Sequence, residues 1–329
     1  MTEISHSDKI MAHVKYWGDF FQMIINVRKT FQNPLKLLFR SFKNDFPINA
    51  VLKNGDKIKV KTFNSMFFIS NVPKNQQINY DVEKDTVTLY QEEESTRKEI
   101  ILHGGINNGD IVNTFFKKDY ASISVKGKTI LDIGANIGDT AIFYALNGAK
   151  KVIGVEPFPK NFQLARENVV VNKLENTIKL LQAGCSSKNG TVKIDPEYQS
   201  NIESKLKNFV NGVDVPLLTL QEIIEKFEIP KNSVLKMDCE GCEYDIIENT
   251  PIEDLIHFSS MQIEYHSGFS NLKRKLESIG YNVTVTKPHA TDVVNSLFSS
   301  FKLMNHSSRY KKINHKVGYS GFILAFKNN

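Results

Sequence analysis

Cysteine is scarce in this chain of 329 residues, which contains only Cys185, Cys239 and Cys242. An odd number without a regular spacing does not predict a disulfide framework, so we expect a reducing compartment. Cys239 and Cys242 form one Cys-x-x-Cys pair. A structural zinc site needs a second such pair or histidines at ligand spacing, and neither is evident. We therefore expect two small residues packed beside an acidic motif.

Long hydrophobic runs are also missing. No uninterrupted apolar stretch reaches the roughly 18 residues of a membrane-spanning helix, and the first residues lack the order of a signal peptide. Neither sign of charge dominates, because 42 Lys and Arg stand against 36 Asp and Glu, spread along the chain. The net charge of +6 permits nucleic acid or an anionic surface as a partner but requires neither. We expect a cytoplasmic protein without a transmembrane segment.

Residues 10–31 are predicted to form an amphipathic helix. Ile10, Val14, Trp17, Phe21 and Ile24 recur at helical spacing. The first interpretation is that this apolar stripe packs onto the rest of the protein. The alternative is a helix that contacts a membrane surface or a partner.

Residues 50–103 have short apolar runs separated by turn signals. The Asn54-Gly55 pair between two such runs predicts a hairpin. Further strand-like runs at residues 86–90 and 99–103 extend a small β-rich unit without a catalytic constellation. Residues 1–108 are therefore predicted to form an N-terminal helix plus a small β-rich region.

From about residue 110 the chain alternates strand-like and helix-like segments, which predicts an α/β fold. We expect a doubly wound, mostly parallel, Rossmann-like sheet of seven strands in a domain over residues 109–329. The strands are predicted at residues 129–132, 151–156, 178–183, 234–238, 261–265, 281–286 and 321–326. Helices are predicted between them, for example at residues 159–172 and 220–227.

The segment 131–139 combines a strand end, two glycines and a helix start. Gly134 and Gly138 allow a tight turn and a close approach to a ligand. The dinucleotide fingerprint requires glycine at its third and sixth places, where this chain has Asn136 and Asp139. An acidic side chain would repel a pyrophosphate but suits a ligand with an amino group and a sulfonium. The loop therefore favours S-adenosylmethionine.

Open parallel sheets bind ligands at the carboxyl ends of their strands, so we examined the residues at those ends. Glu156-Pro157 follows the second strand at the distance at which an acidic residue accepts hydrogen bonds from ribose. Ala183 ends the third strand and leaves room for adenine. The fourth and fifth strands end in acidic motifs, which predict a shared pocket formed by Asp238, Glu240, Glu264 and His266.

Together these motifs resemble the FkbM family of S-adenosylmethionine-dependent methyltransferases. The resemblance covers about residues 110–285 and implies a class I methyltransferase fold and O-methylation of a hydroxyl on a sugar, glycan, glycolipid or other small molecule. Positions that match cofactor-binding residues are Asp132, Gly134, Ala135, Asn136, Gly138, Asp139, Glu156, Pro157, Ala183 and Asp238. Positions that match acidic motifs near the catalytic centre are Asp238, Glu240, Glu243, Glu264 and His266.

An alcohol is a poor nucleophile at neutral pH, so a base or a metal should assist it. His266 is the first candidate for the base, and Asp238, Glu240 and Glu264 complete the proposed catalytic group. Alternatively, the same four side chains could bind Mg²⁺. The long connection at residues 287–317 would overhang the pocket as a lid if the last strand runs antiparallel, although a peripheral helix explains it equally well.

Two other functions remain open. An RNA methyltransferase is one alternative, although the chain has no basic stripe interleaved with aromatic residues, which makes nucleic acid a weaker candidate than a small molecule. The other alternative is a non-catalytic module that binds the cofactor and has a regulatory role.

Overall fold

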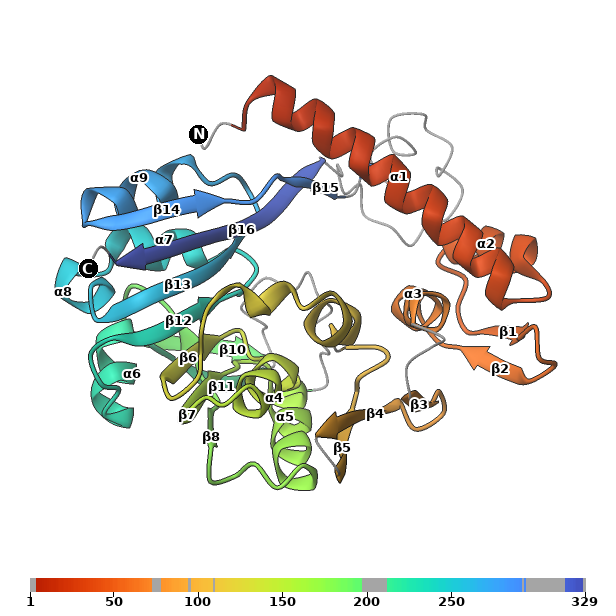
Figure 1. Ribbon diagram of the computed structural model, residues 1–329, viewed down its shortest axis with the longest axis horizontal. Coiled ribbons are helices and arrows are strands. Elements are labelled where there is room, and N and C mark those ends of the chain that lie inside the picture. The colour runs from red at the N-terminus through yellow and green to blue at the C-terminus, as the bar shows by residue number, and fades with distance from the viewer. Residues whose placement is uncertain are drawn as a thin grey trace.

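The computed structural model describes residues 4–72, 78–93, 96–108, 110–196, 212–291, 293 and 317–327. A twisted sheet with the strand order β14-β16-β13-β12-β6-β7-β8 forms its centre (Figure 1). The bounds of its strands are β6 Thr129–Ile133, β7 Lys151–Val155, β8 Ile178–Leu181, β12 Ser233–Met237, β13 Phe258–Tyr265, β14 Tyr281–Val285 and β16 Gly318–Lys327. All seven strands predicted from the sequence are confirmed.

Strands β6, β7, β8, β12 and β13 run parallel, whereas β16 is antiparallel to both of its neighbours, β13 and β14. The short strand β15, His289–Thr291, adds to β16. Every residue of β6 and β12 is buried, as expected for parallel strands covered on both faces. The predicted α/β, doubly wound, mostly parallel sheet is therefore confirmed.

The helices lie on both faces of the sheet. On one face, α4 (Asp139–Leu146) and α5 (Pro159–Val171) share a core with Ile130 of β6. On the other face, α6 (Leu220–Phe227), α7 (Cys242–Asn249), α8 (Ile252–Leu255) and α9 (Ser270–Ser278) share a core with Leu131. Adjacent residues of β6 thus enter opposite cores. A small sheet of β9 (Gly184–Cys185), β10 (Gly190–Ile194) and β11 (Val213–Leu218) completes this part.

The N-terminal part combines helices with two small antiparallel sheets. Its elements are α1 (His6–Thr30), α2 (Pro34–Phe42), β1 (Ile48–Val51), β2 (Lys57–Val60), α3 (Phe63–Asn71), β3 (Ile78–Asp81), β4 (Thr86–Glu93) and β5 (Thr96–His103). The hairpin predicted at Asn54-Gly55 is confirmed, because β1 pairs antiparallel with β2. Helix α3 was not predicted. Its start is fixed by a capping box between Thr62 and Ser65.

Two short segments, η1 (Val112–Lys117, a π-helix) and η2 (Asp119–Ser122), connect the N-terminal part to β6. The N-terminal elements are not separated from the sheet by a gap in packing. Phe31, Ile48 and Leu102 belong to the same hydrophobic core as Ile130 and Ile142. In addition, the side chains of Asn168 on α5 and of Asn172, directly after α5, hydrogen-bond the backbone of β5.

The orientation predicted for α1 is only partly right, since Trp17 and Ile24 of the predicted stripe pack against buried clusters. Ile10, Val14 and Phe21, which belong to the stripe expected to pack inward, are 51%, 62% and 58% exposed. The helix instead packs through another face, which carries Ala12, Met23, Val27 and Thr30. Because α1 has apolar residues on two faces, its periodicity predicts the helix but not which face meets the protein.

None of the helices in the described ranges is long and apolar enough to cross a membrane. Most of the segment 287–317, for which we predicted a lid, lies outside the described residues. At its described ends, β15 pairs with β16, and Lys15 Nζ of α1 donates a hydrogen bond to His289 Nε2 at 3.1 Å.

Candidate active site

A pocket opens at the carboxyl ends of β6, β7, β12 and β13. Gly134, in the loop after β6, has φ +80°, and a Cβ on it would overlap the carbonyl oxygen of Asp238. Only glycine therefore lets the loop after β6 touch the loop after β12. This contact forms the floor of the pocket and explains why the two motifs occur together in the sequence.

A buried ion pair holds the same two strands together. Lys236 of β12 is the register partner of Asp132 on β6, and Lys236 Nζ lies 3.0 Å from Asp132 Oδ1. Thr140 Oγ1 donates to the other Asp132 oxygen at 2.6 Å, and Lys236 Nζ donates to the Gly134 carbonyl oxygen at 3.0 Å. These partners compensate the cost of burying both charges and fix the glycine loop in place.

Seven of the ten predicted cofactor-binding residues line the pocket: Gly134, Asn136, Asp139, Glu156, Pro157, Ala183 and Asp238. Asp132, Ala135 and Gly138 do not line it. Asp132 is used by the ion pair, and Ala135 is fully buried. A Cβ on Gly138 would lie 3.3 Å from Ala165 Cβ, so Gly138 allows α4 to begin close against α5.

Glu156 is held firmly at the pocket wall. One carboxylate oxygen accepts the N–H of Asn136 and the other accepts the N–H of Phe158, both at 2.9 Å. Burial raises the pKa of this carboxyl to about 8, against the lowering effect of the two hydrogen bonds. Each carboxylate oxygen can accept a further hydrogen bond, so the position is suited to a ligand that carries hydroxyl donors.

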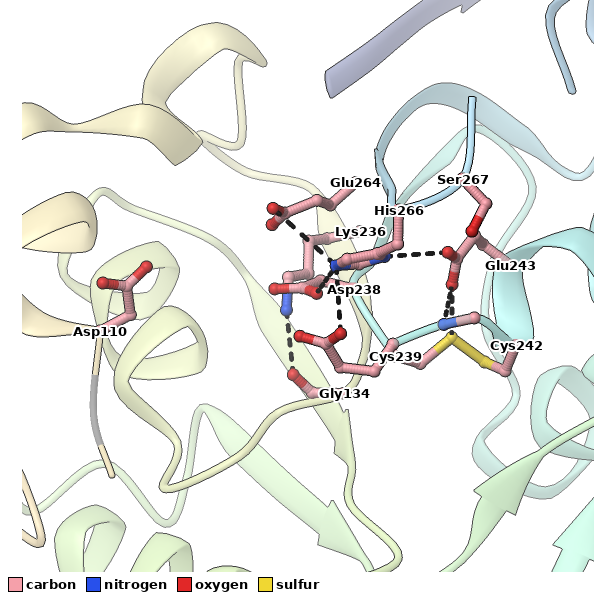
Figure 2. A network of polar contacts seen from close by, with 12 residues as sticks. Asp110, Gly134, Lys236, Asp238, Cys239, Cys242, Glu243, Glu264, His266 and Ser267 are labelled. Carbon is pink, nitrogen blue, oxygen red and sulfur yellow. Dashed lines mark hydrogen bonds and ion pairs between the residues drawn. A yellow bond between two sulfur atoms is a disulfide. The ribbon is translucent and has the colours of Figure 1, made fainter. Parts of the chain in front are cut away.

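His266 lies among four carboxylates (Figure 2). Its Nδ1 is 2.9 Å from Glu243 Oε1, and Glu243 is fully buried. Its Nε2 lies 3.5 Å from Glu240, 3.8 Å from Asp238 and 3.9 Å from Glu264. The predicted convergence of the acidic motifs is therefore present in the structure, and Asp238, Glu240 and Glu264 line the pocket, whereas His266 stands behind them and does not line it.

This environment determines the charge of His266. Burial alone lowers its pKa, but the hydrogen bond to Glu243 and the charges of Glu240 and Asp238 outweigh burial and raise the pKa to about 10. The imidazole is then protonated at neutral pH and cannot accept another proton. This raised pKa makes the ring a weak proton acceptor at neutral pH, and the role of His266 as general base stays a prediction.

Three pocket residues were missed from the sequence because they lie in the segment before β6. Tyr120 donates its hydroxyl hydrogen to Asp238 at 3.0 Å, and both Asp110 and Asn113 line the pocket. Burial raises the pKa of Asp110 to about 6 and that of its neighbour Asp139 to about 7. The sequence did mark Asp110, because this acidic residue directly precedes the apolar pair Ile111 and Val112.

The interpretation of Cys239 and Cys242 as two unlinked small residues is wrong. A disulfide joins them across the loop between β12 and α7, while Cys185 is free and buried (Figure 2). Both cysteines line the pocket. The Cys-x-x-Cys spacing brings the two sulfur atoms close at a helix start, but spacing alone does not state the redox form.

Asp238, Glu264 and His266 place potential metal-ligand atoms within 4.8 Å of one another. However, a protonated imidazole has no free lone pair for a metal, and its charge already faces the carboxylates. Beyond this grouping of ligand atoms, the described part of the chain offers no support for the Mg²⁺ alternative.

The lining of the pocket has an excess of acidic side chains. It contains Asp110, Asp139, Glu156, Asp238, Glu240 and Glu264, against one lysine, Lys236. In addition, Asn113 Oδ1 is buried without a hydrogen-bond partner in the structure. An unpaired hydrogen-bond acceptor in an acidic pocket suits a ligand that has hydrogen-bond donors and a positive charge.

The sheet order, the antiparallel β16 and the pocket beside the glycine loop define the class I fold of S-adenosylmethionine-dependent methyltransferases. Residues 132–283 match the family model described as "Methyltransferase FkbM domain". This match, over a little less than half of the chain, supports an FkbM-type S-adenosylmethionine-dependent methyltransferase.

Individual relatives are more distant. The hexuronic acid methyltransferase AglP of Haloferax volcanii is 26% identical over 138 residues, which cover 42% of this chain and 55% of AglP. The ribosomal protein L11 methyltransferase of Alkaliphilus oremlandii is 33% identical over 121 residues, 35% of this chain and 38% of that protein. The chain thus spans about half of AglP and less of the L11 enzyme.

Among solved structures, M. jannaschii TYW2 in complex with AdoMet aligns with a TM-score of 0.37 and 15% identity, covering 76% of this chain and 90% of that one. A structural similarity this low carries no argument about the family or the function of this chain.

Proposed function

We propose that this protein transfers a methyl group from S-adenosylmethionine to a hydroxyl of a sugar, a glycan or another small molecule. The observation that carries the proposal is the acidic pocket at the joined ends of β6 and β12. The match to the FkbM domain model supports methyl transfer, and the similarity to a hexuronic acid methyltransferase supports a sugar acceptor.

The lining residues suit the parts of the cofactor. Glu156 would accept hydrogen bonds from the ribose hydroxyls, and the small side chain of Ala183 leaves space for adenine. The backbone of the loop at Gly134 and Asn136 would approach the amino acid part closely. The surrounding carboxylates favour the positive charges of the ammonium and the sulfonium.

The acceptor hydroxyl must lose a proton during transfer, and we assign its removal to Glu264. When bound, the cofactor would supply an electrophilic methyl group. Glu264 lines the pocket and lies 3.9 Å from His266 Nε2, farther than a hydrogen bond. Burial and the nearby charge of Asp238 raise its pKa well above the ordinary value, whereas the positive charge of His266 lowers it and favours the ionised carboxylate. Once ionised, Glu264 is a stronger base than an exposed glutamate. Protonated His266 orients the carboxylates and keeps them from repelling one another.

Cofactor binding can be tested at Glu156. We expect Glu156→Gln to weaken the binding of S-adenosylmethionine by roughly 2- to 10-fold, because a hydrogen bond contributes roughly 0.5–1.5 kcal/mol. Isothermal titration calorimetry of the purified protein measures the affinity. Glu167→Gln changes an exposed glutamate on α5 and serves as the matched control. Equal affinities of Glu156→Gln and the parent protein would refute the ribose assignment.

The acceptor class requires incubation of the full chain with methyl-labelled S-adenosylmethionine and fractionated extracts that separate glycans, small molecules, RNA and protein. We expect label in the glycan or small-molecule fraction, and we expect Glu264→Gln to abolish it while retaining cofactor binding. Label confined to RNA or protein would overturn the proposed acceptor. Tight cofactor binding without label in any fraction would identify a non-catalytic module.

A further inference from the structure

Helices α1 and α2 present an apolar surface that the described protein leaves uncovered. On α1 it is formed by Ile10, Met11, Val14, Phe21 and Ile25, which are between 44% and 62% exposed. These residues share one side of the helix, opposite the buried residues Ala12, Met23 and Val27. A helix that is apolar on its outer side as well as its inner side does not follow from packing within this chain.

The apolar surface continues onto α2. Leu35 and Phe39 are 82% and 61% exposed. Phe42 of α2 lies against Phe20 of α1, with ring centroids 5.8 Å apart, and Phe20 lies 6.0 Å from the exposed ring of Phe21, so these aromatic rings join the two helices into one α1–α2 surface. Figure 1 shows both helices at the edge of the molecule, with α1 running along its outside.

Basic residues border this surface. Residues 6–43 contain seven Lys or Arg, two Asp and no Glu, so most of the net charge of +6 of the chain comes from this segment. Lys15, Arg28, Lys29, Lys36 and Lys43 are exposed. The ammonium group of Lys43 lies 4.1 Å from the centre of the Phe39 ring, so positive charge stands directly beside an exposed aromatic side chain.

We propose that the α1–α2 surface binds an anionic lipid membrane, with both helices lying in the plane of the interface. Exposed apolar side chains enter the boundary between headgroups and acyl chains, while the bordering Lys and Arg contact anionic headgroups. A second copy of the chain fits less well. A symmetric contact through this surface would bring two sets of basic residues together. The proposal does not depend on the proposed methyl transfer.

Vesicle sedimentation with the full chain tests this proposal. We expect the protein to sediment with vesicles of phosphatidylcholine and phosphatidylserine, but not with phosphatidylcholine alone, and to be released by high salt. The chain has one tryptophan, Trp17 on α1, whose ring centroid lies 6.2 Å from that of Phe21. Its fluorescence should shift to shorter wavelength when anionic vesicles are added, because the ring moves into a drier environment.

Two pairs of substitutions separate the apolar from the electrostatic contribution. Val14→Ser with Phe21→Ser, and separately Lys29→Glu with Lys36→Glu, should each weaken vesicle binding by about tenfold or more. The matched controls are Val170→Ser with Ile252→Ser, and Lys231→Glu with Arg274→Glu, which change exposed residues elsewhere and should bind as the parent does. Since all these positions are exposed, we expect every variant to fold.

The proposal is overturned if the parent protein stays in the supernatant with anionic vesicles, or if both test pairs bind as their controls do. It is also overturned if ultracentrifugation shows a dimer that Val14→Ser with Phe21→Ser dissociates, because the surface would then contact a second copy.

Discussion

At the scale of single residues, the charge of His266 decides how the acidic pocket works. The ordinary pKa of histidine is about 6.5, and that of His266 is raised to about 10. A group whose pKa is raised on folding stabilises the folded state below its unfolded pKa, and this contribution is lost as the pH rises through the folded pKa. His266 should therefore stabilise the protein at neutral pH and stop doing so near pH 10.

We predict that His266→Gln lowers the free energy of unfolding near pH 7 by about 3 kcal/mol, because it leaves buried carboxylates without their cation. The difference from the parent should shrink towards pH 10, as measured by urea unfolding at several pH values. His257→Gln, which removes an imidazole bonded to the Ile229 carbonyl oxygen, controls for loss of the ring. A histidine NMR titration of His266 with a midpoint near 6.5 would instead restore its role as the base.

The site residues that stand at the carboxyl ends of strands were predicted correctly from the sequence. Asp238 and Glu264 were found because the carboxyl ends of parallel strands converge. Asp110 and Tyr120 were not found, because π- and 3₁₀-helical turns leave no periodic pattern. Lys236 could have been recognised as special, since a lysine within a buried parallel strand needs a partner such as Asp132.

At the scale of elements, the contact between the β6–α4 loop and the β12–α7 loop depends on Gly134. We predict that Gly134→Ala lowers the free energy of unfolding by more than about 2 kcal/mol and abolishes cofactor binding, because the methyl group displaces the Asp238 carbonyl and the backbone is strained at positive φ. Thermal unfolding and calorimetry measure the two effects.

A glycine in open space provides the contrast. A Cβ on Gly18, in the middle of α1, would meet nothing within 4 Å, so Gly18→Ala should raise stability by about 0.5–1 kcal/mol through helix propensity. If Gly134→Ala behaves like Gly18→Ala, the two loops do not meet as described.

Helix α1 also shows why the buried face of an element is harder to predict than the element itself. Periodicity identified α1, but its neighbours in the fold decided which side is buried.

At the scale of the whole molecule, the part before β6 and the methyltransferase domain share a core and a set of hydrogen bonds. Asn168 of α5 is fully buried, and its Oδ1 accepts the N–H of His103 in β5 at 2.6 Å. Its Nδ2 donates to the carbonyl oxygens of His103 at 3.0 Å and Ile137 at 2.9 Å. One side chain thus ties β5 both to α5 and to the glycine loop, so unfolding of one part should unfold the other.

We predict that the full chain unfolds in one calorimetric transition and that Asn168→Ala moves this whole transition to lower temperature without splitting it. The loss should be about 2–4 kcal/mol, because three buried backbone groups lose their partner at once. Asn249→Ala is the matched control, since Asn249 hydrogen-bonds only within α7, to Asp245. Two transitions, of which only the lower responds to Asn168→Ala, would mean that the N-terminal part folds independently and that α5 merely supports it.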